Sequence, residues 1–81
     1  MYKVVRRENI QRSGSTISLR QKGQKMSIVE SNNGDILGFD LKKKQWEEAI
    51  NAPSLADFWD RNFENALTAG RAFQNERGDH Q

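Results

Sequence analysis

The chain has 81 residues, enough for one small domain, and a chain of this size buries a smaller share of its surface than a larger one. It contains no cysteine, which excludes disulfide bonds and thiolate metal sites and fits a reducing compartment, so the cytoplasm is the expected location. No apolar run approaches the roughly 20 residues of a membrane span, and we expect neither a membrane anchor nor a secretory signal.

The charge of the chain is divided unevenly. Through Gln45 there are ten Lys and Arg residues against four acids, which gives +6; from Trp46 onward there are three against seven, which gives −4, and the sum is the net +2. A basic first half suits contact with a polyanion. An acidic, aromatic-rich second half suits packing or pairing with a partner.

The basic half predicts an antiparallel β-meander of three or four strands. Apolar and polar residues alternate most clearly after residue 14, and this period of two is typical of half-buried strands. Residues 8–14 are polar and predict a loop. Residues 32–35 contain Asn33-Gly34, a strong hairpin signal because both residue types tolerate positive φ. The predicted strands are residues 2–7, 15–21, 26–31 and 36–41.

After residue 41 the period of the apolar residues changes to 3.6, which predicts helices. Asp40 is a candidate N-cap for a first, short helix. This helix ends before Pro53, because the residue that precedes a proline is disfavoured in helical geometry. The residues on its apolar side are Trp46, Ala49 and Ile50.

A second, longer helix is predicted to begin at Ser54, because Ser54 and Asp57 have the spacing of a capping box. We therefore predict the α+β class, an antiparallel three- or four-stranded meander followed by a short helix and a longer C-terminal amphipathic helix. One domain would span residues 1–76, with a flexible polar tail at 77–81. The apolar stripe of the second helix consists of Leu55, Phe58, Trp59, Phe63, Ala66, Leu67, Gly70 and Phe73.

Residues that commonly carry catalysis are scarce. The single histidine, His80, is next to the last residue, where a general base is hard to hold in place. Asp57, Asp60 and Glu64 share a helical spacing that could bind Mg²⁺ with a substrate phosphate. Arg61 beside them favours a charged outer face instead. We predict no catalytic residue, no metal site and no cofactor.

The basic residues are the strongest candidates for a site. A sheet that packs on helices with one face leaves its other face free, and cations gathered there would suit phosphate groups. Lysines in the first turn of a helix oppose its macrodipole, so solvation or an anionic partner must favour them. The predicted nucleic-acid-binding residues are Arg6, Arg7, Arg20, Lys22 and Lys25, with Lys42, Lys43 and Lys44 as auxiliary contacts.

Aromatic residues decide whether such a surface stacks with bases or contacts only backbones. Tyr2 is the one candidate for stacking in the first strands, because Phe39 is expected in the core. The second helix is longer than a strand, so part of its apolar stripe is expected to bury itself in a partner, most economically a second copy in a homodimer. This predicted partner or dimer interface consists of Phe58, Trp59, Phe63 and Phe73.

Residues 15–50 resemble the strand–strand–strand–helix core of the transcriptional-coactivator family of single-stranded-DNA-binding proteins. The resemblance rests on residues 17–20 (ISLR), 26–29 (MSIV), 34–41 (GDILGFDL) and 42–50 (KKKQWEEAI). It implies a dimer whose curved, basic sheet face holds unpaired DNA, a basic hairpin at Arg20, Lys22 and Lys25, and Trp46 packed on the sheet. The order of elements is also similar to the arm-binding domains of tyrosine recombinases, which read duplex DNA.

The sequence thus predicts a non-catalytic nucleic-acid-binding module that contacts phosphates through a basic strand face. Whether the nucleic acid is single-stranded or a duplex stays open, and so does the choice between DNA and RNA. The alternative is a small protein-binding inhibitor or adaptor, of the kind that phages and mobile elements use against host nucleic-acid enzymes or defence complexes.

Overall fold

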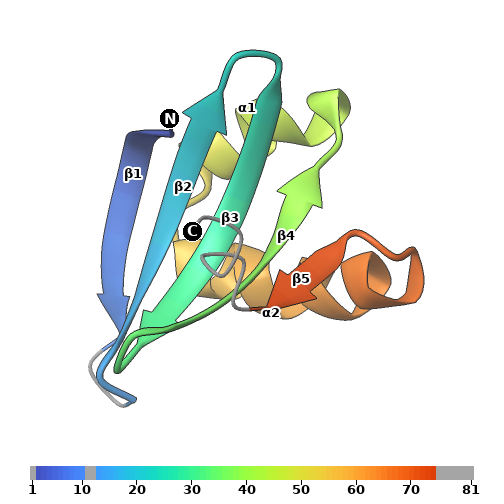
Figure 1. Cartoon of the computed structure of the whole chain (residues 1–81). Helices are drawn as coiled ribbons and strands as arrows, with labels where there is room; N and C mark the ends of the chain where they lie inside the picture. The colour runs from blue at the N-terminus through green and yellow to red at the C-terminus, as the bar shows by residue number, and fades with distance from the viewer. Residues whose placement is uncertain (1, 11–12, 75–81) are drawn as a thin grey trace.

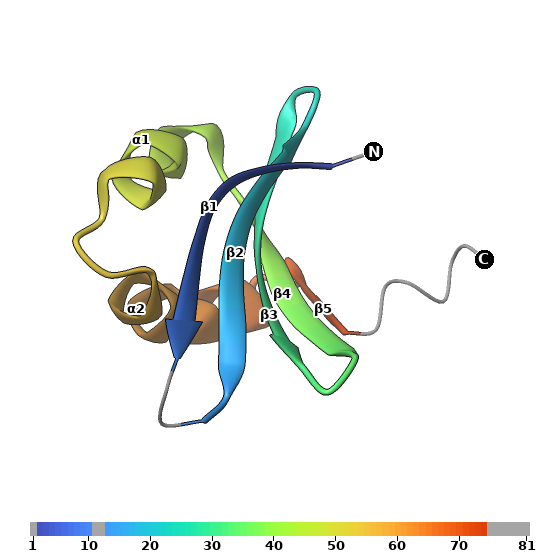
Figure 2. The same cartoon turned by 90° about the vertical axis from the view of Figure 1, so that its left-hand side faces the viewer.

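The computed structural model describes residues 2–10 and 13–74, which form one antiparallel sheet with two helices against one of its faces (Figure 1). The strands lie in the order β1-β2-β3-β4-β5, so each pairs with its neighbour in the chain. Figure 2 shows the curved sheet from its edge, with both helices on the same side. The elements are β1 (Lys3–Ile10), β2 (Ser15–Lys22), β3 (Lys25–Asn32), β4 (Asp35–Leu41), α1 (Lys43–Asn51), α2 (Leu55–Thr68) and β5 (Ala72–Gln74).

The predicted α+β class and four-stranded meander are confirmed, whereas the fifth strand was not predicted. The predicted tail at 77–81, and the predicted domain end at 76, lie outside the described residues. Across the described ranges, neither helix has the length and apolar character needed to cross a bilayer.

The β3–β4 hairpin turns where the sequence predicted it. Asn33 and Gly34 have φ values of 53° and 88°, as a type I′ turn requires. The first strand, by contrast, continues to Ile10, so the loop predicted from residue 8 begins too early. The reason is tertiary, because Glu8 pairs with Ile17 and Ile10 with Ser15 on β2, and this pairing extends the strand through polar residues.

The core lies between the sheet and the two helices. Of the side chains expected on the inward faces of β2, β3 and β4, six are buried, and Leu37 is partly buried and packs against them. Three aromatic rings connect the sheet to α2: the Phe39 centroid lies 5.2 Å from that of Trp59 and 6.1 Å from that of Phe63, and Trp59 stacks on Phe63 at 5.1 Å. The confirmed inward residues are Ile17, Leu19, Met26, Ile28, Phe39 and Leu41.

The start of α1 differs from the prediction. Asp40 is not the N-cap, because it lies in β4, paired with Ser27 of β3. Lys42 is the N-cap, and its backbone N–H donates to the Gln45 side-chain oxygen at 3.1 Å. The two-residue difference arises because β4 extends to Leu41 before the helix can begin.

The end of α2 also differs from the prediction. The helix stops at Thr68, so Gly70 and Phe73, which were assigned to its apolar stripe, lie beyond it. Gly70 has a φ of 76°, which turns the chain back toward β4. Phe73 then enters β5 and pairs with Gly38.

The predicted cap of α2 is confirmed, because the Ser54 hydroxyl accepts a hydrogen bond from the backbone N–H of Asp57 at 3.2 Å. We expect Ser54→Ala to lower the free energy of unfolding by about 1 kcal/mol, since one N–H of the first turn loses its acceptor. Ser54→Asp keeps an acceptor there and should cost much less. Urea unfolding of the two variants checks this prediction. Equal losses of unfolding free energy for Ser54→Ala and Ser54→Asp would show that the N-cap hydrogen bond does not stabilise the chain.

Candidate nucleic-acid interface

The face of the sheet opposite the helices carries the polar side chains of the strands. Residues paired across neighbouring strands point to the same face. Arg20 of β2 pairs with Val4 and with Ser27, and Ser27 pairs with Asp40, so this row lies on the face away from the buried core. We call this the open face.

Three of the predicted basic residues lie together at one end of the open face. Lys22 pairs with Lys25 directly beside the two-residue turn that joins β2 to β3. Both lysines are exposed. Arg20 is two residues back along β2, and alternation along the strand gives it the same face as Lys22.

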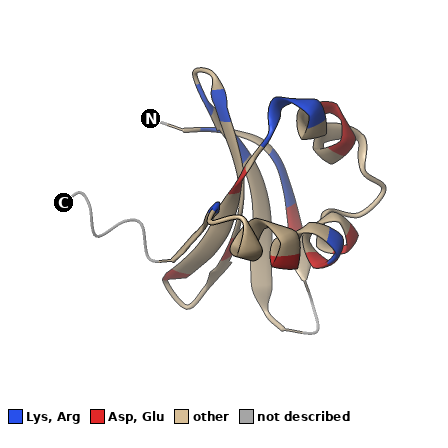
Figure 3. Cartoon of the chain, turned by 90° about the vertical axis from the view of Figure 1, so that its right-hand side faces the viewer, with Lys and Arg blue, Asp and Glu red and all other residues tan. Residues whose placement is uncertain are grey.

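The lysine run at the start of α1 reaches the same end of the molecule. The Lys43 ammonium group donates to the side-chain oxygen of Gln24, in the β2–β3 turn, at 3.0 Å. Figure 3 shows the basic side of the hairpin and the basic start of α1 near each other, with acidic segments further along both helices. We call this cluster the basic end; it consists of Arg20, Lys22, Lys25, Lys42, Lys43 and Lys44.

Arg6 and Arg7 do not share a face, because neighbours in a strand point in opposite directions. Arg7 pairs with Ser18 on the open face. Arg6 pairs with Leu19 on the covered face, and its guanidinium donates to the carbonyl oxygens of Ala49 and Ile50, each at 3.2 Å. Arg6 therefore satisfies carbonyl groups at the end of α1, and the structure separates it from the other predicted basic residues.

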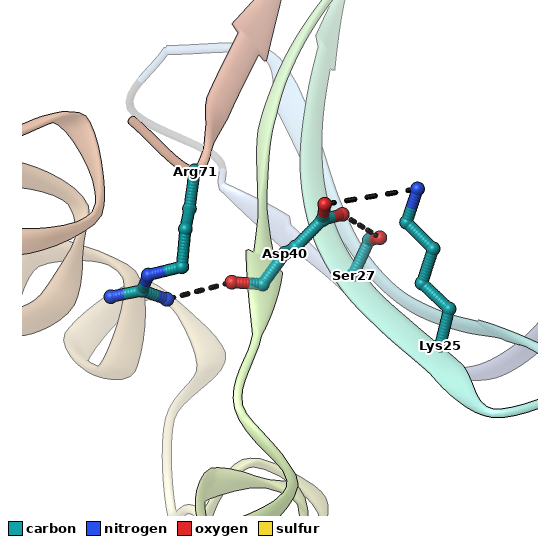
Figure 4. A network of polar contacts seen from close by, with 4 residues as sticks. All are labelled: Lys25, Ser27, Asp40 and Arg71. Atoms are coloured by element: carbon teal, nitrogen blue, oxygen red, sulfur yellow. Dashed lines mark hydrogen bonds and ion pairs between the residues drawn. The ribbon is translucent and has the colours of Figure 1, made fainter. Parts of the chain in front are cut away.

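One acidic residue lies within the basic end. The Asp40 carboxylate accepts a hydrogen bond from the Ser27 hydroxyl at 2.8 Å and lies 3.7 Å from the Lys25 ammonium group, while its backbone carbonyl accepts from Arg71 at 2.8 Å (Figure 4). The Lys25 and Asp40 side chains are 53% and 36% exposed. An ion pair this exposed is weak, so it leaves Lys25 available to another anion.

The acids of α1 do not neutralise this cluster through any ion pair among the described residues. Glu48 instead lies 3.7 Å from Arg61 of α2. Among the described residues, the acidic segments of α1 and α2 therefore lie apart from the basic end, as Figure 3 shows.

Aromatic rings flank Arg20 on the open face. Its guanidinium carbon lies 4.0 Å from the Tyr2 ring centroid and 5.9 Å from that of Phe73. Burial lowers the pKa of Arg20 from its ordinary value, and the neighbouring Tyr2 and Asp40 act in the opposite direction. A guanidinium remains protonated at neutral pH in such a setting, so Arg20 is a cation held between two rings.

The sequence identified Tyr2 as a stacking candidate but missed Phe73. Phe73 pairs with Gly38, which pairs with Val29, and this row lies on the open face. The signal that could have revealed it is Gly70, a helix-ending residue three positions earlier.

The four aromatic residues predicted as a partner surface do not form one. Phe58 has no exposed surface and Trp59 is 8% exposed, because both pack in the chain's own core, and Phe63 packs against that core while half-buried. Phe73 lies on the other side of the sheet. This corrects the predicted interface, since Phe58 and Trp59 of α2 are covered by the chain's own sheet.

The acidic residues considered for Mg²⁺, Asp57, Asp60 and Glu64, are all exposed on α2. Within residues 2–10 and 13–74, no group of three or more His, Cys, Asp or Glu residues is arranged to hold a metal ion. His80 lies outside the described residues.

Comparison with protein-family models, with curated proteins and with solved structures finds no match to this chain. The similarity to the transcriptional-coactivator family therefore stays a prediction. Any function has to be argued from the surface itself.

Proposed function

We propose that this chain is a non-catalytic nucleic-acid-binding module that holds a phosphate backbone at the basic end. The observation that carries the proposal is the contact between Lys43 and Gln24, which brings the lysine run and the β2–β3 hairpin to one place. These two sets of cations are separated by about 19 residues in the sequence. They are all side chains outside the buried core, so core packing does not account for their meeting.

The chemistry of the basic end suits phosphates. Five of the six cations of the basic end are lysines, and the lysine side chain is a point charge on a flexible stem. Such side chains can contact the phosphates of a nucleic acid without recognising its base sequence. Binding of phosphates releases condensed counterions from the nucleic acid, and this supplies affinity that falls as salt rises. The weak pair between Lys25 and Asp40 can exchange its carboxylate for a phosphate oxygen.

The alternative of a protein-binding adaptor loses the surface predicted for it, because Phe58 and Trp59 are buried in the chain's own core. Its remaining candidates are the charged faces. The gathering of cations at one end favours a polyanion over a protein partner.

A salt titration with labelled single-stranded and duplex oligonucleotides tests the proposal. We expect Lys22→Ala to make the slope of log affinity against log salt shallower by about 0.9 for duplex DNA or about 0.7 for a single strand, the effect of one lost phosphate contact. Arg61→Ala is the matched control: it changes the net charge equally, but on α2, beside Glu48. Negligible binding at low salt, or equal slopes for both variants, would reject the proposal.

A further inference from the structure

A cavity of about 240 Å³ lies between the sheet and α2. Ile10 and Ser13 line it where β1 ends and β2 is about to begin, and Ala56 and Trp59 line it from α2. Figure 2 shows α2 beside this end of the sheet, whereas α1 lies nearer the β2–β3 hairpin. The cavity is therefore at the opposite end of the sheet from the basic end and shares no residue with it.

Apolar side chains make up much of the cavity wall. Ile17 and Trp59 belong to the buried core, and Ile10 and Ala56 are partly buried and pack against that core. The wall is also held in place, because the Glu8 carboxylate accepts a hydrogen bond from the backbone N–H of Ala56 at 2.9 Å and so joins the start of α2 to β1. A fixed apolar wall suits the aliphatic part of a ligand.

A carboxylate interrupts this wall where alternation would place another core residue. Glu30 is the third inward position of β3, after Met26 and Ile28, which are both buried. On the neighbouring strands it pairs with Ile17 and Leu37, which are both part of the core or packed against it. A charge among apolar neighbours costs free energy unless water or a partner compensates it.

The charge of Glu30 has no protein partner in the described part of the chain. Within residues 2–10 and 13–74, no side chain forms a hydrogen bond or an ion pair with its carboxylate, and the same holds for Asp60, which lines the cavity from α2. Glu8, in the same row as Glu30, differs because it is engaged with Ala56. Two uncompensated carboxylates beside one cavity attract a positive charge.

The size and the wall of the cavity indicate which kind of cation it suits. Pockets for small molecules usually measure about 300–1,000 Å³, so this one is small for a ligand that must bind on its own. A metal ion is disfavoured, because no three His, Cys, Asp or Glu residues in the described ranges are arranged to hold one. Lysine and arginine side chains combine an apolar stem with a charged head, and they match both the wall and the carboxylates.

We propose that the cavity receives one long basic side chain, lysine or arginine, of a protein partner. The stem would lie against the apolar wall, and the charged head would lie near Glu30 and Asp60. Asp57 and Glu64 are exposed on α2 within about one turn of Asp60. These acids add to the negative potential around the cavity, which steers a basic partner toward it.

This site goes beyond the proposed nucleic-acid binding and does not rest on it. The cavity and the basic end lie at opposite ends of the sheet, so the chain can hold a phosphate backbone and a basic protein at the same time. Each proposal is tested with residues that the other does not use. Failure of the salt titration with Lys22→Ala would therefore leave this inference standing, and the reverse is also true.

An NMR titration with capped tripeptides tests the proposal through the indole N–H signals of the two tryptophans. Trp59 lines the cavity and Trp46 lies on α1, and the variant Trp46→Phe assigns the two signals. We expect acetyl-Gly-Lys-Gly-amide, or its arginine equivalent, to shift the Trp59 signal with a dissociation constant of about 1 mM and to leave the Trp46 signal in place. The same peptide with norleucine keeps the stem but lacks the charge, and it should bind about tenfold more weakly.

Two isosteric variants test the carboxylates. Glu30→Gln and Asp60→Asn each remove one charge with little change of shape, and each should weaken binding of the lysine peptide about fivefold. Glu64→Gln is the matched control, because it removes one exposed acid of α2 that does not line the cavity, and it should change the affinity less than about twofold.

Several results would overturn the proposal. These are an unmoved Trp59 signal at about 10 mM peptide, equal affinity for the norleucine peptide, and an equal loss of affinity for Glu64→Gln and Glu30→Gln. Binding that appears only after Arg12→Ala would show that the chain fills the cavity with its own side chain. Butylamine that binds as tightly as the lysine peptide would assign the cavity to a free amine in place of a protein partner.

Discussion

Replacing Phe39 with alanine is expected to lower the free energy of unfolding by about 3–5 kcal/mol. The ring has no exposed surface and contacts both Trp59 and Phe63, so it joins β4 to α2. Alanine would leave a cavity under a strand that is paired on both sides, by β3 and by β5. A strand held in this way cannot move inward to fill the space.

The size of this loss matters because a small domain has little stability to spare. Native domains are stable by about 5–15 kcal/mol, and a chain of 81 residues belongs near the lower end. We expect urea unfolding of Phe39→Ala to begin close to zero denaturant. Leu67→Ala, at an exposed position of α2, should stay within about 0.5 kcal/mol of the unmodified chain. A loss below about 1 kcal/mol for Phe39→Ala would show that the aromatic cluster does not hold the helix to the sheet.

Features determined by neighbours in the sequence could be predicted. The β3–β4 turn follows from Asn33-Gly34, and the start of α2 follows from Ser54, because each residue type suits one local backbone geometry. The inward faces of the strands follow from alternation alone. These signals need no knowledge of the rest of the chain.

Features determined by distant pairing could not be predicted. β5 is a three-residue strand that exists because it pairs with β4, and in the sequence Phe73 continues the helical spacing of α2. The extension of β1 through Glu8 and Asn9 likewise depends on β2. In both places tertiary pairing overrides a weak local preference.

The candidate site was predicted in part. The strand cluster at Arg20, Lys22 and Lys25 follows from the hairpin, whereas its meeting with the lysine run depends on how α1 folds back against the sheet. The charge of Arg6 predicts a place on the same surface, but charge alone does not indicate which face of a strand a residue takes. The rule that neighbours alternate would have excluded Arg6 or Arg7 from the sequence alone.

The close packing of β3 and β5 around Gly38 in β4 yields a second strong prediction. A methyl group there would lie 2.6 Å from the carbonyl oxygen of Ile28, 2.6 Å from Val29 Cγ1 and 2.9 Å from Phe73 Cζ. All three distances are shorter than carbon contacts allow. We therefore expect Gly38→Ala to lower the free energy of unfolding by about 1–3 kcal/mol, because either the strand pairing or the Phe73 ring must shift.

A double-mutant cycle identifies which group shifts. Phe73→Ala removes one of the three close contacts, so Gly38→Ala should cost less in that background than in the unmodified chain, by about 0.5 kcal/mol or more. The overlap with the Ile28 carbonyl remains in both backgrounds and sets a cost that Phe73→Ala cannot relieve. If the losses of unfolding free energy of the two single variants simply add in the double variant, the Phe73 ring moves aside without cost when a methyl group is present at position 38.

The same cycle connects the fold to the open face. Phe73 lies 5.9 Å from the Arg20 guanidinium, so a displaced ring changes the surroundings of a cation in the basic end. If Phe73 only holds β5 in place, Gly38→Ala should alter stability and leave the salt slope of oligonucleotide binding unchanged, since the number of phosphate contacts is the same. A changed slope would show that the ring also positions Arg20 for its ligand.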